Sequence, residues 1–560
     1  MNYKTYRRLS RIARGLEKAD VVLHGAHVLD VFNECWRTAD VAIADEYIVG
    51  IGTYEGVENV NCTGKYIVPG FIDSHLHLES TLVNPQELVY EAMQFGTTAF
   101  VVDPHEAANV AGLKGIQYML DATAQCEADV YVMAPSCVPA IAGEDNGAVL
   151  DAADLAKLLD NPRILGLGEV MDCPSVLDGE PGMMDKLALF AHRVKDGHSI
   201  GLSPVQVQAY ALAGITTNHE CVTYEEAKDQ VANGMYVWIR EGSAAHNLDA
   251  IVKGLVADGA PTARYGFCTD DKHIEDIQAQ GHISYNVRRA IELGIPPIDA
   301  FKMASYNTAI CYNLQRRGAV APGYRADMVI LDDEQARSIT DVWIQGKPVS
   351  ECVRRPNVPA PVELLQTVNI GRFTEDKLQM IVNGPQAVIT MVPGQIVTTK
   401  TVEELPAIDG VFTPNAVYYK ITCIERYRAS GRNGVAAVKG FNLHNGAIAT
   451  SFAHDAHNVV VIGDNDADMM VAIDRMVRIG GGYVIASEGK VIAELPLEIM
   501  GLISNRPHEE VDAKVKAMKE IAYGMRISRA FDPFINLSFL ALSVIPSLRI
   551  TTKGLVEVGM

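Results

Sequence analysis

Two histidines stand one residue apart in the stretch GFIDSHLHLES, residues 70–80, directly after an apolar run. In an extended strand alternate side chains point to the same face, so His75 and His77 would project together from one rigid element. Two neutral imidazoles placed in this way can bind a metal ion. The same residues can also form a hydrogen-bonded pair at a strand end, and this stretch alone does not distinguish the two interpretations.

Further histidines and carboxylates occur at the ends of apolar segments along the chain. They are Glu169 in LGLGEV, His198 in DGHSIGL, His219 in TNHEC and Asp270 in CTDD. A single histidine at such a position is more often a satisfied core residue than a ligand. Imidazole and carboxylate together suit divalent Zn, Mn or Fe, and the absence of cysteine argues against a closed structural zinc site. The whole set would be enough for two ions, with Glu169 placed to bridge them.

The segments that would position these residues follow the pattern of a (β/α)8 barrel. Apolar strand-like segments, from IVPGFIDSH to YGFCTDD, alternate with amphipathic helical stretches such as MMDKLALFAHRVKDG over about 250 residues. Each candidate residue then stands at the C-terminal end of a strand, the face of such barrels that carries the active site. We therefore expect all of them to converge at one mouth.

Short β segments flank this region on both sides. Residues 19–66 contain runs rich in Val and Ile, and a related pattern returns at residues 318–349, so we expect the two pieces to pair in one sheet. The predicted architecture is α/β, with a (β/α)8 barrel, a small β satellite domain and a C-terminal α+β domain. Its predicted parts are residues 1–66 (an N-terminal helix and part of the satellite domain), 67–317 (the barrel), 318–355 (the rest of the satellite domain) and, after a Pro-rich connector, 365–560 (the C-terminal domain).

Length and composition limit the class of protein. A chain of 560 residues, of which 48% are hydrophobic, exceeds what one core normally supports. The net charge of -21 argues against a nucleic-acid partner, and no apolar run has the length and purity of a membrane span. The ten cysteines are scattered without a CxxC pair, and the N-terminus lacks the apolar core of a secretory signal. We therefore expect a cytoplasmic protein with reduced thiols.

The HxH strand, the later single histidines and the Asp after the last strand resemble the amidohydrolase superfamily. Longer strings resemble its bacterial adenine deaminase family: PGFIDSHLHLES, GTTAFVVDPHEAANV, GLGEVMDCPSV, IREGSAAHNL and, in the last domain, AHDAHNVVVIGDNDADM. The resemblance covers nearly the whole chain. It implies that the metal ligands are His75, His77, Glu169, His198, His219 and Asp270. Relatives that hydrolyse cyclic amides use a carbamylated lysine at strand 4, and RILGLGEV contains no lysine, which disfavours that reaction.

The resemblance implies hydrolytic deamination of adenine to hypoxanthine and ammonia in purine salvage, with two divalent ions, Mn or Fe rather than Zn alone. A metal-bound water of lowered pKa would attack C6, and Asp270 would carry its proton to the departing ammonia. Glu79 or Glu106 would protonate the purine ring nitrogen beside C6. The structural alternatives are a helix-start carboxylate for Glu79 and a turn residue for Glu106. Asp271 would instead orient a histidine ligand.

For partners, we expect adenine as the small-molecule substrate and a homo-oligomer, in the simplest case a dimer. Two alternatives stay open: an amidohydrolase acting on another aminated purine or heterocycle, and a catalytically silent barrel scaffold, which the presence of every expected ligand disfavours. In the last domain, His454 and His457 of AHDAHN would share one face if helical and help to cover the substrate. The other interpretation is a hydrogen-bonded turn before the apolar strand VVVIG.

Overall fold

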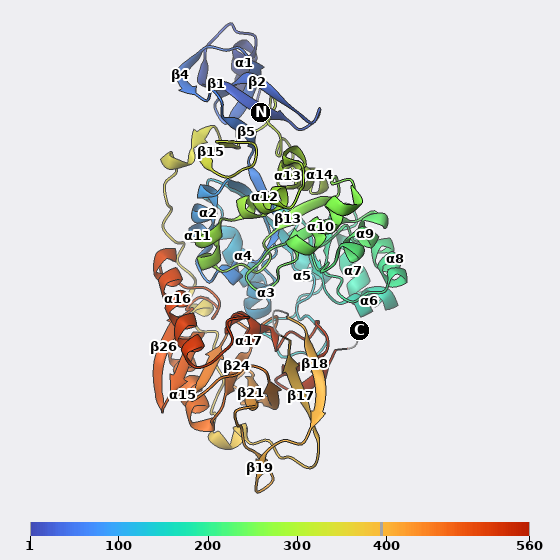
Figure 1. Ribbon diagram of the computed structural model, residues 1–560, viewed down its shortest axis with the longest axis vertical. Helices are drawn as coiled ribbons and strands as arrows, with labels where there is room; N and C mark the ends of the chain where they lie inside the picture. The colour runs from blue at the N-terminus through green and yellow to red at the C-terminus, as the bar shows by residue number, and fades with distance from the viewer. Residues whose placement is uncertain (1, 393–395, 559–560) are drawn as a thin grey trace.

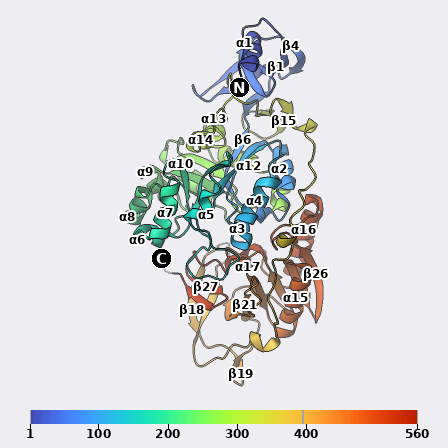
Figure 2. The ribbon, with the colours of Figure 1, turned by 180° about the vertical axis from the view of Figure 1, so that it is seen from behind.

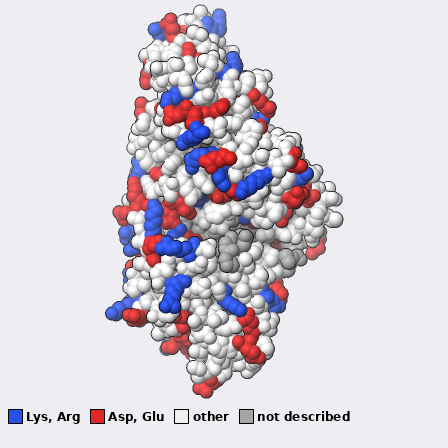
Figure 3. All heavy atoms as spheres, in the orientation of Figure 1, with Lys and Arg blue, Asp and Glu red and all other residues white. Residues whose placement is uncertain are grey.

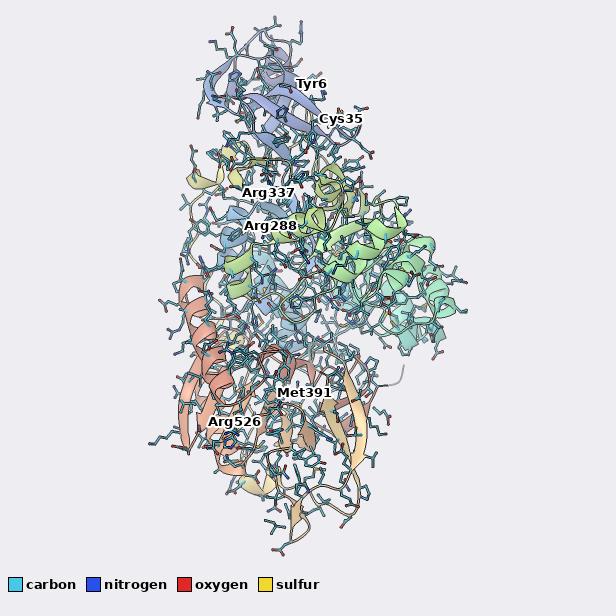
Figure 4. All side chains as sticks on the ribbon, in the orientation of Figure 1. Tyr6, Cys35, Arg288, Arg337, Met391 and Arg526 are labelled. Atoms are coloured by element: carbon cyan, nitrogen blue, oxygen red, sulfur yellow. The ribbon has the colours of Figure 1, made fainter. Side chains whose placement is uncertain are left out.

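The computed structural model describes residues 2–392 and 396–558, and its elements form three regions along the longest axis (Figure 1). A satellite sheet lies at one end, the barrel in the middle and the C-terminal region at the other end, in both Figure 1 and the reverse view of Figure 2. In Figure 4, Tyr6 and Cys35 mark the satellite region, whereas Met391 and Arg526 mark the C-terminal region. The barrel therefore adjoins the satellite sheet at one end and the C-terminal region at the other.

The satellite sheet is built from two chain segments that are far apart in sequence. Helix α1 (Tyr3–Ala13) precedes β1 (Ala19–Asp30), β2 (Cys35–Ala44), β3 (Tyr47–Gly52), β4 (Gly56–Asn61) and β5 (Tyr66–Pro69), and the second segment supplies β14 (Met328–Leu331), β15 (Ile339–Ile344) and β16 (Lys347–Pro348). The strand order is β16-β15-β14-β5-β1-β2-β3, with β4 beside β1. Strand β14 runs antiparallel to β5, with Met328 opposite Pro69. This pairing holds together the segments that enter and leave the barrel.

The middle region contains, among the described residues, eight parallel strands. They are β6 (Phe71–Leu76), β7 (Thr97–Val102), β8 (Asp129–Ala134), β9 (Ile164–Val170), β10 (Val194–Gly197), β11 (Thr217–Asn218), β12 (Tyr236–Arg240) and β13 (Tyr265–Cys268). Strands β10-β9-β8-β7-β6 form one sheet and β11-β12-β13 another. Thr216 N–H donates to the Lys195 carbonyl at 2.8 Å and Asp270 N–H to the His75 carbonyl at 3.0 Å, which joins the two sheets at both edges. The predicted (β/α)8 barrel is therefore present.

Helices follow the barrel strands and cover the outside of the ring (Figures 1 and 2). They are α2 (Pro85–Gln94), α3 (His105–Ala111), α4 (Leu113–Ala122), α5 (Ala152–Ala156), α6 (Cys173–Asp178), α7 (Pro181–Leu189), α8 (Pro204–Leu212), α9 (Tyr224–Ala232), α10 (Leu248–Asp258), α11 (Ile274–Gln280), α12 (Ile283–Glu292), α13 (Pro297–Met303) and α14 (Tyr306–Cys311).

One predicted helix is wrong in its extent. The sequence pattern favoured a helix through residues 183–197, but α7 ends at Leu189 and Val194–Gly197 forms β10. Val194 pairs in parallel with Gly166 of β9, so tertiary pairing overrides the local helical pattern. The fifth strand thus ends immediately before His198, whereas the sequence placed it over GHSIGL.

The C-terminal region is a sheet in the order β18-β17-β22-β21-β24-β23-β25-β26 with helices packed on it. Its strands are β17 (Gln386–Met391), β18 (Thr398–Glu403), β21 (Tyr418–Ile424), β22 (Asn433–Lys439), β23 (Ala447–Thr450), β24 (Val459–Gly463), β25 (Gly482–Ser487) and β26 (Lys490–Pro496), and its helices are α15 (Asp466–Ile479), α16 (His508–Gly524) and α17 (Ile535–Phe539). Two hairpins, β19 (Ala407–Ile408) with β20 (Val411–Phe412) and β27 (Leu548–Thr551) with β28 (Gly554–Glu557), complete it. Figures 1 and 2 both place α17 beside α3, at the junction with the barrel.

The charged side chains and the cysteines complete the description of the fold. On the face shown in Figure 3, Lys and Arg are interspersed with Asp and Glu. All ten cysteines are free. Within residues 2–392 and 396–558, no helix combines the length and the apolar character that crossing a membrane requires.

Candidate metal centre at the mouth of the barrel

The barrel brings all the predicted ligands to one end of the ring. His75 lies on β6 and Glu169 on β9, and the others directly follow a strand: His77 after β6, His198 after β10, His219 after β11 and Asp270 shortly after β13. All are buried, because the parallel strands end at the same rim and the C-terminal region covers it. The predicted residues therefore do converge at one end of the barrel.

Four of these residues form a first group around Oε1 of Glu169. His75 Nε2 lies 3.0 Å from this oxygen and 3.5 Å from Oδ1 of Asp270. His77 Nε2 lies 2.9 Å and 3.1 Å from the same two oxygens. Since each bond from a cation to such a donor is about 2 Å long, donors about 3 Å apart can share one ion.

The second group meets the first at the other oxygen of the same carboxylate. His198 Nδ1 lies 2.6 Å from Oε2 of Glu169, and His219 Nε2 lies 3.5 Å from it. The ligand atoms of each group lie within 4.8 Å of one another. Glu169 therefore presents one oxygen to each group, which is the geometry that a bridging carboxylate requires.

The hydrogen bonding of these residues fits a bound cation. Among the described residues, Nε2 of His75, His198 and His219 and Oε1 of Glu169 are buried and have no hydrogen-bond partner of good geometry. Buried polar atoms of folded proteins are otherwise nearly always paired. Imidazole nitrogens and carboxylate oxygens are the donors that Mn, Fe and Zn accept.

The charges in the site favour ionised carboxylates. Burial would raise the pKa of Glu169, but the neighbouring charges of His75, His219 and His77 hold it well below its ordinary value. Burial would likewise lower the pKa of His75, but the neighbouring carboxylates of Glu169 and Asp270 raise it to about 10. Without a cation the carboxylates are therefore ionised and His75 is protonated, so a metal ion that binds here would displace that proton.

A buried aspartate positions the bridging glutamate. Asp103, which follows β7, accepts a hydrogen bond at Oδ2 from the Glu169 backbone N–H at 2.8 Å. Its backbone carbonyl lies 2.8 Å from Nδ1 of His77, which fixes the orientation of that imidazole. A Cβ atom at Gly168 would lie only 2.2 Å from Oδ2 of Asp103, so the close approach requires glycine there.

Sequence reasoning missed a histidine that adjoins the centre. His105, at the start of α3, has its Nδ1 atom 3.5 Å from Oε1 of Glu169 and its Nε2 atom 3.5 Å from Oδ1 of Asp455. It is buried. The available signal was its place in VVDPHE, directly after the second apolar strand.

A buried ion-pair network on strands β11 and β12 was also missed. Arg240 donates from Nη2 to Oε2 of Glu220 at 3.0 Å and from Nη1 to Oδ2 of Asp270 at 2.9 Å. Glu220 Oε1 in turn lies 3.4 Å from His219 Nε2. Arg240 therefore fixes the oxygen of Asp270 that is turned away from the first group. The signal was an arginine at the end of the seventh strand, in IREG.

The two glutamates expected to protonate the purine lie near the centre but do not line its cavity. Glu79 Oε1 accepts from the Ala107 backbone N–H at 2.9 Å, and burial, followed by the charge of Glu106, raises the pKa of Glu79 to about 8. Glu106 contacts Ser80, whose hydroxyl also donates to Asp271. Asp271 itself lines the cavity, which measures about 20 Å³.

Comparison with known proteins agrees with this geometry. The family model described as "Amidohydrolase family" matches residues 66–349, and the model described as "Adenine deaminase C-terminal domain" matches residues 395–560. An adenine deaminase of Desulfitobacterium hafniense is 50% identical, covering 100% of this chain and 98% of its own. The chain belongs to the adenine deaminase family of amidohydrolases.

Other relatives give the same result. Adenine deaminases of Halalkalibacterium halodurans and Clostridium acetobutylicum are 42% and 41% identical, each over 98% of this chain, and the match covers 96% and 97% of their own lengths. A crystal structure of an adenine deaminase has 15% identity and a TM-score of 0.46, covering 59% of this chain and 99% of its own, which is too distant to add to the assignment. Amidohydrolases depend on metal, in agreement with the buried clusters at the barrel mouth.

The adenine deaminase C-terminal region reaches the barrel mouth through the AHDAHN segment. This segment forms a turn before β24, as the second of the two interpretations predicted. His454 Nε2 lies 2.9 Å from Oε1 of Glu106 and 3.5 Å from Oδ1 of Asp271, and its ring stacks on Phe539 at 4.8 Å. His457, by contrast, accepts from the Ala453 backbone N–H at 3.2 Å and stabilises the turn.

Proposed function

We propose that this protein catalyses the hydrolytic deamination of adenine to hypoxanthine and ammonia, and that it acts in purine salvage. The observation that supports this best is the carboxylate of Glu169, shared by two groups of buried ligands at the mouth of an amidohydrolase barrel. Full-length relatives named adenine deaminase support the substrate. The proposed ligands are His75, His77, Glu169, His198, His219 and Asp270.

The cofactor in this proposal is a pair of divalent ions, Mn or Fe, with Zn as the alternative. When bound, such ions supply Lewis acidity and a nucleophile generated from water at neutral pH. The protein's own contribution is to fix the donors and exclude bulk water, which strengthens every electrostatic interaction in the site. The small buried cavity beside Glu169 suits that role.

Asp270 is the proposed carrier of the proton from the attacking water to the departing ammonia. Burial would raise the pKa of Asp270, but the nearby imidazoles of His75 and His77 and the charge of Arg240 hold it well below its ordinary value. Its Oδ2 atom is held by Arg240 at 2.9 Å. The carboxylate is therefore ionised and oriented, as a general base must be before it accepts a proton.

Glu106 is the better placed of the two candidates for protonating the purine ring. His454 lines the cavity and contacts Glu106, whereas Oε1 of Glu79 accepts a hydrogen bond from the backbone N–H of Ala107. Glu79, with its pKa raised to about 8, is protonated at neutral pH and can supply a proton to its neighbour. We propose that Glu79 supplies the proton and that Glu106 passes it to the ring nitrogen through His454, which lines the cavity.

The test is ammonia release from adenine by purified protein reconstituted with Mn. We expect stoichiometric formation of hypoxanthine and ammonia, with adenine preferred over other aminated purines and heterocycles in a substrate panel. Inert protein with its metal sites filled would exclude adenine deamination. A clear preference for a different aminated heterocycle would favour the alternative amidohydrolase.

The remaining parts of the proposal concern the cellular form of the protein. We propose a cytoplasmic homo-oligomer, in the simplest case a dimer, whose division into residues 1–66, 67–317, 318–355 and 365–560 follows the sequence prediction. The pairing of β14 with β5 supports the assignment of both flanking segments to one satellite unit. Sedimentation of the purified protein tests the oligomeric state.

A further inference from the structure

The cavity at the metal centre is too small for the proposed substrate. Its volume is about 20 Å³, which is room for about one water molecule and not for a bicyclic ring. Its walls include Ile396, Phe539, Leu542 and Ile545 from the C-terminal region, facing the ligands of the barrel. This cavity must therefore widen when adenine binds, and adenine must enter it from a neighbouring space.

A second cavity, of about 610 Å³, lies directly beside the first. Glu220 lines both cavities. At three further places, two consecutive residues line different cavities. The cavity at the metal centre is lined by His198, Ile396 and Ile545, and the larger one by the residues that follow them, Ser199, Val397 and Pro546. Only a thin partition therefore separates the two spaces. We call the larger one the vestibule.

The partition is made of apolar side chains from three segments. Ile545 belongs to a buried cluster with Phe539, against which Ile200 and Ile396 pack. On the C-terminal side, the buried Arg549 holds the carbonyls of Phe539, Ile545 and Ile396 at 2.9, 2.8 and 3.1 Å. Ile200 lies opposite, in the short loop between β10 and α8. One side of the partition is thus held by three hydrogen bonds, whereas the other is the side chain of a loop residue.

The vestibule contains an unused hydrogen-bond acceptor. Gln230 of α9 is 4% exposed and donates from Nε2 to the Ser199 hydroxyl at 3.0 Å, but its Oε1 atom has no partner among the described residues. A buried amide oxygen without a partner is unusual in a folded protein. Apolar side chains of Leu202, Val222 and Val397 line the same space. This combination suits a neutral planar heterocycle that carries an amino group.

We propose that the vestibule is the docking site through which an aminopurine reaches the metal centre, with Gln230 Oε1 accepting a hydrogen bond from its exocyclic amine. The ring lies against the apolar wall and passes between Ile200 and Ile545 to the ligands. The inference rests on the proposed deamination of adenine and specifies its route and a specificity-determining residue.

Two variants of the Mn-reconstituted full-length protein test the route. Thr399 is exposed at the vestibule, and Thr399→Trp should obstruct it and lower kcat/KM for adenine at least ten-fold. Val402→Trp is the control, because Val402 is 63% exposed on the same strand, β18, but does not line the vestibule. It should leave kcat/KM within two-fold of the parent, with equal metal content in both variants.

Gln230→Leu tests the acceptor separately. Loss of one neutral hydrogen bond should raise KM for adenine about two- to ten-fold with kcat little changed. Glu225→Leu, at an exposed position of the same helix, is the control. If folded Thr399→Trp and Gln230→Leu both keep the parent kcat/KM, the vestibule is not the route. A parent inert toward adenine would instead refute the proposed function, so the two failures are distinguishable.

Discussion

His454 Nε2, from the C-terminal region, lies 2.9 Å from Oε1 of Glu106, which follows the second barrel strand. Burial would lower the pKa of His454, but the charge and hydrogen bond of Asp271 and the hydrogen bond of Glu106 raise it to about 10. A charged imidazole therefore joins two buried carboxylates of the barrel. The barrel and the C-terminal region therefore both contribute side chains to this buried cluster.

Replacing His454 should impair catalysis. His454→Ala leaves Glu106 and Asp271 buried without their cationic partner, which strongly perturbs the carboxylate expected to serve the purine ring. We expect kcat/KM for adenine to fall at least ten-fold, with a changed acid limb in the pH profile of kcat. His444→Ala, at an exposed position, is the control. Folded His454→Ala with parent kcat/KM and an unchanged pH profile would refute this role.

Metal analysis should find two divalent ions per chain at full activity. Six buried ligands in two groups that share Glu169 exceed the need of one tetrahedral centre. Glu169→Gln should therefore reduce occupancy at both positions, because the neutral amide is a poor bridge. The measurement is elemental analysis with parallel activity assays. Full activity with one equivalent would exclude the pair.

The positions of the ligands could be predicted from sequence because barrel topology is regular. Parallel strands end on one rim, so residues at or just after the ends of strands β6, β9, β10, β11 and β13 meet there whatever the details of packing. This is why His75 and Asp270, far apart in the chain, lie 3.5 Å apart at Nε2 and Oδ1.

What sequence could not predict are contacts set by tertiary packing. Arg240 looks like an ordinary strand-end arginine, and only the barrel places it between Glu220 and Asp270. The sequence left AHDAHN open between a helix and a turn, because the spacing of His454 and His457 is compatible with both. The helix predicted over residues 183–197 was too long, because pairing with β9 makes Val194–Gly197 a strand, β10.

Stability should depend on pH through a histidine at another contact between the barrel and the C-terminal region. His508 at the start of α16 lies 2.9 Å from Glu87 and 3.3 Å from Glu91 of α2, and Arg354 and Glu509 also face it. Burial would lower the pKa of His508, but hydrogen bonds to both α2 glutamates raise it from 6.5 to about 9. The charged imidazole thus links the two regions.

The sign of the pH effect follows from this raised pKa. The stabilisation by His508 is fully present below pH 6.5 and is lost as the pH rises through about 9. Between these values we expect the free energy of unfolding to fall by about 1 kcal/mol. The effect is no larger because solvent screens part of the interaction. Calorimetry of the parent and His508→Ala over this range measures it, and the variant should show the smaller decline. Equal declines would refute the contribution.

Asp270 should be indispensable to the rate of deamination. Asp270→Asn is nearly isosteric and should keep the fold, but the amide cannot accept and pass on the proton. General acid and base contributions are worth about 10² to 10⁴ in rate, so we expect a loss of about 3 to 5 kcal/mol of transition-state stabilisation. The parent rate should fall on the acid side, as the groups that accept the proton become protonated. Adenosine should be a poor substrate, because the enclosed cavity beside the ligands must widen further to admit a ribose than to admit the free base. Steady-state assays on adenine and adenosine, with metal content measured for each preparation, check these outcomes. An Asp270→Asn variant with near-parent kcat at equal metal occupancy would overturn the assignment of the proton carrier.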